Sequence, residues 1–414
     1  MQTKLRAQAT GCHKPHSLMS VSSHLSLIIL AGLAGAVGWT ASAEPLQLRP
    51  AVAIMDGGSP LLPGTPGSGY AIPCATDWNG DGKKDLLVGY QPRGWIAVYL
   101  NQGTDAQPCF TNFTALETAD GTVIEFQSNG CGAPAPWVGD FDGDGKRDLL
   151  IGTGADGKVW FYRNTNTDAA PLLAPGVKLK TQAGDLSVGI RATPCVCDWD
   201  GDGTNDLLCG AGDGYAYFFK NTNSVQAPVF APAMKIQAGG TNLFLGIRSV
   251  LRVFDWDVDG LKDLVCSSDT GVYWCRNTNS NSNPILQGPV PLRAPVAGTG
   301  LTNIYYYTGE RLRLDLVDWN NDGVMDLLLG NTDGTVYYYE GYHFQINSMD
   351  PQPGNKVALQ WESSPYLSYD VQTSGSLTNF QNFAVTNLPS GGNRTAWTNQ
   401  MQSDQQFFRI QIAR

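Results

Sequence analysis

The sequence predicts an all-β protein: a five-bladed β-propeller over residues 44–342, closed by an N-terminal strand, and a small C-terminal β-sandwich-like domain over residues 343–414. Three observations support this fold. A nine-residue acidic pattern recurs five times, with first residues 57 to 63 positions apart. Each copy is followed by aromatic and β-branched residues between glycine and asparagine, which is typical of strands. After residue 43, no segment of useful length has the apolar period of a helix.

Residues 1–43 are predicted to form a signal peptide. Basic residues precede an apolar run from Leu25 to Trp39, and Ala41 and Ala43 form the small-residue pattern that signal peptidase accepts. The 15 residues of this run are rich in glycine and alanine and are short for a hydrocarbon core of roughly 30 Å. We therefore expect cleavage near Ala43 and a secreted, periplasmic or cell-surface protein whose mature chain has no membrane span.

A repeat of about 60 residues has the length of a four-stranded blade. In the third repeat, strands are expected at Ala192–Cys197, Asp206–Gly210, Tyr215–Asn221 and Pro228–Gln237. The fifth repeat lacks an outermost strand, whereas Leu46–Ile54 supplies a spare strand before the first repeat. We expect this segment to pair with the third strand of the last blade, which would remove the open edges of the ring.

The five acidic loops are predicted to bind metal. Each offers side-chain oxygens at positions 1, 3, 5 and 9 and a backbone carbonyl at position 7, a spacing that wraps a hard cation of calcium size. Position 6 is always glycine and is expected at positive φ, where the chain turns sharply. The candidate ligands at positions 1, 3, 5, 7 and 9 are, for loops one to five in turn, Asp77, Asn79, Asp81, Lys83 and Asp85; Asp140, Asp142, Asp144, Lys146 and Asp148; Asp198, Asp200, Asp202, Thr204 and Asp206; Asp255, Asp257, Asp259, Leu261 and Asp263; and Asp318, Asn320, Asp322, Val324 and Asp326.

The density of acidic residues favours metal binding over ordinary solvated turns. Eighteen of the 37 acidic residues lie in these 45 loop residues, where they would repel one another without a cation. Up to five Ca²⁺ are therefore expected. Loops two and three have the fullest carboxylate sets. Asn79 and Asn320 lower the charge of loops one and five, and Val258 and Asn321 replace glycine at position 4, so weaker sites are expected there.

The acidic loops and the strands after them resemble the FG-GAP/VCBS repeats. The pattern D-x-[DN]-x-DG-x-x-DLL-x-G, followed by G-x-V-x-x-Y-x-N as in Gly157–Asn164, is similar to that of the calcium-loop β-propellers also found in integrin α-subunits. The resemblance covers roughly residues 45–342 and is most specific in the loops. Integrin-type propellers have seven blades, whereas five are countable here. The resemblance implies calcium-supported scaffolding and extracellular recognition, with catalysis in only some members.

Aromatic residues recur at position 2 of the loops. Because every repeat has one, we expect packing between blades rather than stacking on a sugar. These residues are Trp78, Phe141, Trp199, Trp256 and Trp319.

The sequence leaves open whether the cysteines form disulfides or remain free thiols. Eight cysteines follow residue 43, an even number in an oxidising compartment, which permits disulfides. Cys266 and Cys275 flank one predicted hairpin, and Cys109 and Cys131 are a second candidate pair. The alternative is a set of buried thiols, since Cys209 and Cys266 take a position that other repeats fill with aliphatic residues.

The composition of the last 70 or so residues differs from that of the repeats. Strands are expected at Val357–Trp361, Tyr369–Thr373 and Phe407–Ile412. This tail resembles the small fibronectin-III-like modules that end many exported bacterial proteins. It is expected to aid secretion, bind the cell surface or pack on the propeller.

Composition narrows the function to two classes. Residues after 43 carry 24 basic against 37 acidic side chains, which argues against nucleic acid as a partner. Only four histidines occur, and His343 alone follows the predicted cleavage site, which disfavours His-ligated zinc and His-based catalysis. The preferred function is a secreted, non-catalytic recognition or adhesion module for a glycan or a surface protein. The alternative is a polysaccharide-active enzyme, a lyase or hydrolase, because a carboxylate pair formed by folding is invisible in sequence.

Overall fold

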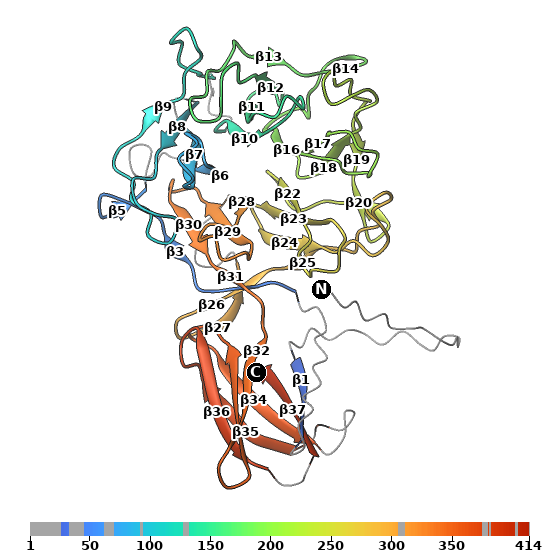
Figure 1. Cartoon of the computed structure of the whole chain (residues 1–414). Coiled ribbons are helices and arrows are strands. Elements are labelled where there is room, and N and C mark those ends of the chain that lie inside the picture. The colour runs from blue at the N-terminus through green and yellow to red at the C-terminus, as the bar shows by residue number, and fades with distance from the viewer. Residues whose placement is uncertain are drawn as a thin grey trace, which may run out of the picture.

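The computed structural model describes residues 26–32, 45–61, 70–91, 94–126, 132–304, 311–374, 380, 382–401 and 405–413, with the backbone alone for 26–32. Within these ranges every regular element is a strand, which confirms the predicted all-β class. A ring of small antiparallel sheets is followed by a second unit of two sheets (Figure 1). In the described part of the chain, no helix is long and apolar enough to cross a membrane.

Five four-stranded sheets make up the ring, and each carries one acidic loop between its first two strands. Their strands, from the inside outward, are β6 (Ile72–Thr76), β7 (Asp85–Tyr90), β8 (Trp95–Tyr99) and β9 (Thr114–Ala115); β10 (Ala135–Gly139), β11 (Asp148–Gly152), β12 (Val159–Tyr162) and β13 (Val177–Lys178); β16 (Thr193–Cys197), β17 (Asp206–Gly210), β18 (Ala216–Phe219) and β19 (Met234–Lys235); β22 (Val250–Phe254), β23 (Asp263–Ser268), β24 (Gly271–Cys275) and β25 (Val290–Pro291); β28 (Arg313–Val317), β29 (Asp326–Gly330), β30 (Val336–Tyr339) and β3 (Val52–Ala53).

The second strand of each sheet is the most deeply buried. Every residue of β7, β11, β17, β23 and β29 is buried. A strand covered on both faces reads as a continuous apolar run rather than an alternating one. The Leu-Leu and Leu-Val pairs after each loop are therefore packed against the sheets on both sides.

The N-terminal segment supplies the outer strand of the fifth sheet. Val52 of β3 lies opposite Tyr338 of β30, and Ala53 lies opposite Tyr337. The inner strands β6, β10, β16, β22 and β28 contact one another in a closed cycle, which surrounds an axis (Figure 1). We interpret this arrangement as the five-bladed closed ring that the sequence predicts.

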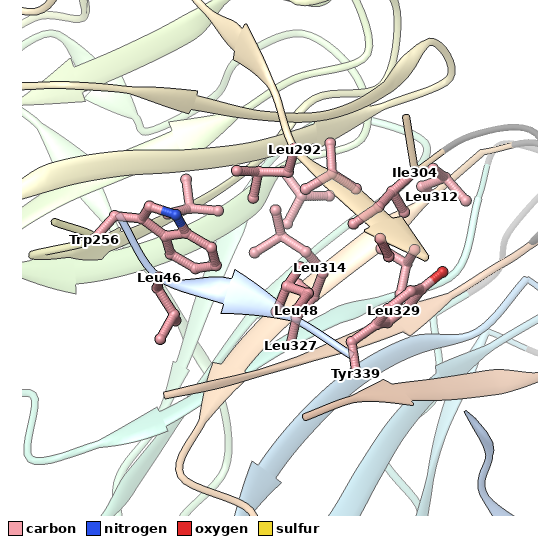
Figure 2. Close-up of a cluster of buried hydrophobic side chains, with 14 residues drawn as sticks. Leu46, Leu48, Trp256, Leu292, Ile304, Leu312, Leu314, Leu327, Leu329 and Tyr339 are labelled. Atoms are coloured by element: carbon pink, nitrogen blue, oxygen red, sulfur yellow. The ribbon is translucent and has the colours of Figure 1, made fainter. Parts of the chain in front are cut away.

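The same segment also fills the space between the fourth and fifth sheets. Leu46 and Leu48 are 3% exposed and pack with Trp256, Leu327 and Leu329 in one apolar cluster (Figure 2). Leu48 belongs to β2 (Gln47–Leu48), which pairs with β31 (Gly341–Tyr342). The N-terminal segment is therefore part of the core of the ring, not only of its edge.

The aromatic residues at position 2 pack as expected. Trp256 is fully buried among residues of the fourth and fifth sheets, and Trp319 lies in a cluster with residues of the first and fifth. Phe141 and Trp199 are buried as well, and Trp78 is half-buried against the first and second sheets. This confirms packing between blades.

Four short hairpins follow the outer strands β3, β13, β19 and β25, and we call the part of the ring that they form the rim. They are β4 (Met55–Asp56) with β5 (Ser59–Pro60), β14 (Lys180–Thr181) with β15 (Gly184–Asp185), β20 (Gln237–Ala238) with β21 (Thr241–Asn242), and β26 (Arg293–Val296) with β27 (Gly300–Asn303).

The C-terminal unit consists of two antiparallel sheets around a core that includes Trp361, Tyr369 and Phe408. All three strands that the sequence predicts there are present. That the unit is fibronectin-III-like stays a prediction. The sheets contain β32 (Ile346–Gln352), β33 (Lys356–Glu362) and β36 (Arg394–Gln400); and β1 (Ser26–Gly32), β37 (Gln405–Ile412), β34 (Ser368–Ser374) and β35 (Asn382–Pro389).

Strand β1 belongs to the predicted signal peptide and pairs with β37, with Ser26 opposite Gln411. The rest of that peptide, including the cleavage site near Ala43, lies outside the described residues. Removal of the peptide therefore stays a prediction.

The candidate disulfide between Cys266 and Cys275 is wrong, because both are free, buried thiols. Cys266 lies opposite Tyr273, and Cys275 lies opposite Leu264, so the two cysteines are diagonal neighbours. Diagonal pairs are about 7–8 Å apart, beyond the usual Cα spacing of a disulfide. Cys131 lies outside the described residues, so its pairing with Cys109 is untested.

Candidate metal centres

Each acidic loop leaves the C-terminal end of an inner strand and turns back into the buried second strand. The glycine at position 6 has a φ between 82° and 88° in all five loops. This confirms the sharp turn at positive φ expected there, a conformation that glycine adopts without steric cost. The five glycines are Gly82, Gly145, Gly203, Gly260 and Gly323.

Two carboxylates fold each loop by accepting backbone hydrogen bonds. In all five, an oxygen of the position 1 aspartate accepts the N–H of the position 6 glycine at 2.8–3.2 Å. An oxygen of the position 5 aspartate accepts the N–H of position 7 at 2.8–3.0 Å. In loops one and three, the other oxygen of the position 1 aspartate, Oδ1 of Asp77 and Asp198, is left without a hydrogen-bond partner. In loops two, four and five it accepts a second backbone N–H of the loop.

The position 9 aspartates anchor the loops to the sheets. All five are fully buried. One oxygen accepts the N–H of position 2, and the other accepts an N–H just beyond the third strand. Burial raises their pKa despite these hydrogen bonds, to about 6 for Asp148, Asp206 and Asp263 and to about 7 for Asp326. The pKa of Asp85 is raised for the same reason.

Several loop oxygens are buried without any hydrogen-bond partner. They are the Oδ1 atoms of Asp77, Asp142, Asp198, Asp200 and Asp257. A buried polar atom without a partner costs free energy, and a buried carboxylate oxygen costs more. A cation would satisfy these atoms, and an all-oxygen donor set suits a hard cation such as Ca²⁺. The residues present therefore fit the metal that the sequence predicts.

The structure brings part of the predicted ligand set together. Among the described residues, three acidic groups have carboxylate oxygens within 4.8 Å of one another: Asp140, Asp142 and Asp148; Asp198, Asp200 and Asp206; and Asp255, Asp257 and Asp259. These are loops two, three and four. Loops one and five have asparagine at position 3, so they hold one carboxylate fewer. The ligand roles of all these residues, including the position 7 carbonyls, stay predictions.

A basic residue at the end of the third strand contacts each of loops two, three and four. Arg163 lies 2.6 Å from Asp142, and Arg276 lies 2.5 Å from Asp257 and 2.9 Å from Asp259. Lys220 binds both Asp200 and Asp202. These side chains engage the Oδ2 atoms, while the Oδ1 atoms of Asp142, Asp200 and Asp257 keep no hydrogen-bond partner.

We did not anticipate these basic residues from the sequence. Their signal is their place directly before the recurrent asparagine. The first repeat has Leu100 there, and the fifth has Glu340, followed by Gly341 in place of the asparagine. In the three most acidic loops, the basic residue offsets the carboxylate repulsion.

Comparisons with protein families cover three of the five loops. The FG-GAP-like repeat family matches residues 255–329, and the FG-GAP repeat family matches residues 138–162. Integrin alpha-4 of Xenopus laevis is 29% identical over 155 residues, which cover 34% of this chain and 14% of that protein. The chain therefore matches only a small part of the curated relative.

Solved structures with likeness to this chain are distant. A lectin of Agrocybe aegerita that recognises non-reducing terminal N-acetylglucosamine is 15% identical, covers 91% of this chain and 96% of its own, and has a TM-score of 0.30. An exo-β-1,3-galactanase of Phanerochaete chrysosporium is 12% identical, covers 83% and 78%, and has a TM-score of 0.29. These scores are too low to support an argument about function. The two family matches and the integrin match agree with the loop pattern, and residues 138–162 and 255–329 are therefore FG-GAP-type repeats on an all-β scaffold.

Proposed function

We propose that this chain is a calcium-binding β-propeller that acts outside the cell as a recognition or adhesion module for a glycan or a surface protein. The single observation behind the metal is the set of five buried carboxylate oxygens without partners. The recognition role is supported by the FG-GAP matches and by the likeness to an integrin α-chain. We further propose export through the predicted signal peptide.

The loops would hold calcium through the side-chain oxygens at positions 1, 3, 5 and 9, which are acids except for Asn79 and Asn320, and through the carbonyl at position 7. The bound ion would supply the charge that these carboxylates lack. The position 1 and 5 acids already shape the turn, and the position 9 acid ties it to the third strand of its sheet. Fixing five loops would thus fix five inner strands and present a rigid face to the ligand.

The contacts of one pair of acids, Glu340 and Glu362, favour a non-catalytic role for that pair. A cleft between the ring and the C-terminal unit is lined by Glu340, Glu362 and His343. Arg49 binds both acids, at 2.9 Å from Glu340 and 3.2 Å from Glu362, and Arg394 also binds Glu362 at 3.1 Å. A carboxylate pair held by arginine joins two parts of the chain rather than serving as acid and base.

The test is glycan-array and cell-surface binding by the purified chain, with calcium, with EDTA, and after calcium is restored. We expect binding that EDTA abolishes and calcium recovers. Asp200→Ala should reduce it, whereas Asp333→Ala, an exposed acid in a turn outside the loops, should not. A polysaccharide depolymerisation screen runs beside it, and steady turnover of any polymer would overturn the non-catalytic proposal.

A further inference from the structure

The end of the axis opposite the acidic loops is basic. A cavity there is lined by residues at or just before the start of the inner strand of each of the five sheets, together with Gln91, which follows β7. Its lining includes Arg191, Arg248, Arg311 and Arg313 and no acidic residue. Four arginines meet at one point in a chain whose net charge is −10. This concentration of positive charge is not a property of the surface as a whole.

The arginines occupy repeat positions that the topology brings to the axis. Arg191, Arg248 and Arg311 each stand seven residues before the first aspartate of a loop, where the first two sheets have Tyr70 and Ala133. All three have positive φ, at 54°, 64° and 62°. Such backbone conformations are unfavourable for arginine and cluster at binding sites.

The contacts of Arg248, Arg311 and Arg313 leave the positive charge of these three side chains in excess. Arg248 is paired with Asp269, which also lies 3.9 Å from Arg313. Arg311 stacks on the ring of Tyr70, with 4.7 Å from guanidinium carbon to ring centre. Below them, Arg252 and Asp315 form a buried pair at 2.6 Å and neutralise each other. Within the described residues, one carboxylate, that of Asp269, thus lies against Arg248 and Arg313 at the mouth.

Two further observations point to a ligand. Gln91 lines the cavity, is 5% exposed, and its Nε2 donor has no hydrogen-bond partner. Arg313 is 6% exposed, and its pKa is lowered by burial and by the three neighbouring arginines, against the pull of Asp269. An anion with several acceptor oxygens would satisfy both features: it would accept from the buried Gln91 donor and balance the charge of the neighbouring guanidinium groups.

We propose that this axial cavity binds one oxyanion group, a carboxylate, sulfate or phosphate, through Arg248, Arg311, Arg313 and Gln91. About 30 Å³ is open to the centre of a water-sized atom, against the 10–15 Å³ or so that one water needs. That space suits the head of an anionic group and not a whole sugar. The rest of a larger ligand, such as a uronic acid residue or a sulfated saccharide, would extend outward along the axis.

The test is isothermal titration of the full chain with sodium sulfate, sodium phosphate and sodium glucuronate, at constant ionic strength set by chloride. We expect saturable binding of at least one oxyanion. Arg311→Gln should weaken it about tenfold or more, since one charge-assisted contact is lost. Arg293→Gln, an exposed arginine on the rim hairpin β26, is the matched control and should bind normally. Gln91→Leu is the second variant, in case Arg311→Gln does not fold.

The outcomes separate the sources of the anion. Binding of glucuronate alone assigns the site to carboxylates, and binding of sulfate or phosphate alone assigns it to their esters. The proposal would be overturned if none of the three anions showed saturable binding. It would also be overturned if the cavity variants bound the anion as well as the rim control does. The titration uses calcium-loaded protein and small anions alone. Its result therefore does not depend on whether the chain also binds a glycan or a surface protein.

Discussion

Position 4 of the acidic loops has a positive φ, which strains the backbone of Val258 in loop four. Its φ is 71° to 72° in loops one to three, where the residue is glycine, and 56° at Val258 in loop four. A β-branched side chain at positive φ is a clear outlier. Because Val258 is 57% exposed, the strain is not repaid by a well-packed side chain. We predict that replacing Val258 by glycine is tolerated better than replacing it by alanine.

The magnitude follows from two opposing effects. Alanine keeps the left-handed strain of about 1–2 kcal/mol that glycine removes. Glycine in turn adds freedom to the unfolded chain, which costs about 0.4–1 kcal/mol. The Val258→Gly protein should therefore exceed Val258→Ala in stability by about 1 kcal/mol. At about 2.1 cal/mol/K per residue, this corresponds to roughly 1–2 °C in Tm for the ring.

The assay is differential scanning calorimetry of both variants with calcium and with EDTA. Val177 is the matched control, since it is equally exposed, at 57%, and is not among the residues at positive φ. There the order should reverse, with alanine more stable than glycine. Equal Tm values for the two Val258 variants, or alanine above glycine at both sites, would refute the strain argument.

The other predictions concern metal, pH and closure of the ring. EDTA should lower the Tm by tens of degrees and Ca²⁺ should restore it, because a site stabilises the fold by about 2.7 kcal/mol when the calcium concentration is 100-fold above its Kd. Mg²⁺ should restore the Tm poorly. A melting curve that EDTA does not change would contradict this prediction. In a calcium titration, Asp202→Ala in the fully acidic loop three should weaken binding more than Asp322→Ala in loop five, and equal losses would count against the ranking of the loops. In EDTA, the Tm should fall as the pH rises through 6 to 7, because the buried carboxyls of Asp148 and Asp326 have raised pKa values in the folded state, so their stabilisation is present at low pH and lost on ionisation. The gain from calcium should therefore grow between pH 5.5 and 8, and a gain that is constant over this range would exclude the effect. Deleting residues 44–56 should lower the Tm of the whole ring, because it removes β3 and a buried part of the core; an unchanged melt would show that the segment closes nothing.

Repetition is why much of the fold was predictable. Five aligned copies place the loops, the buried second strand and the glycine at position 6 without any tertiary information, and the structure agrees at each. The spare strand before the first repeat was visible because the fifth repeat lacked its own. The fate of Cys266 and Cys275 was not visible, because it depends on the strand register: Cys266 lies opposite Tyr273, and a register two residues different would have placed it opposite Cys275.

The axial cavity could not be predicted for a different reason. Arg191, Arg248 and Arg311 are about 60 residues apart and have no common motif, since two of the five repeats lack arginine there. Only closure of the ring brings them together. Arg163 and Lys220 contact a loop of their own sheet about 20 residues earlier, so pairing of the strands within that sheet, and not closure of the ring, brings them to their partners.

The acidic loops and the basic cavity are the two ends of the same five inner strands. Each strand that carries an arginine at the axis reaches its metal loop seven residues later, a span of roughly 23 Å for extended chain. Charges that far apart interact weakly at physiological salt, where the screening length is about 8 Å. Calcium and an axial anion would therefore not attract each other appreciably. Any influence of one on the other would pass through the position of the inner strands, which the loops fix at one end and the arginines meet at the other.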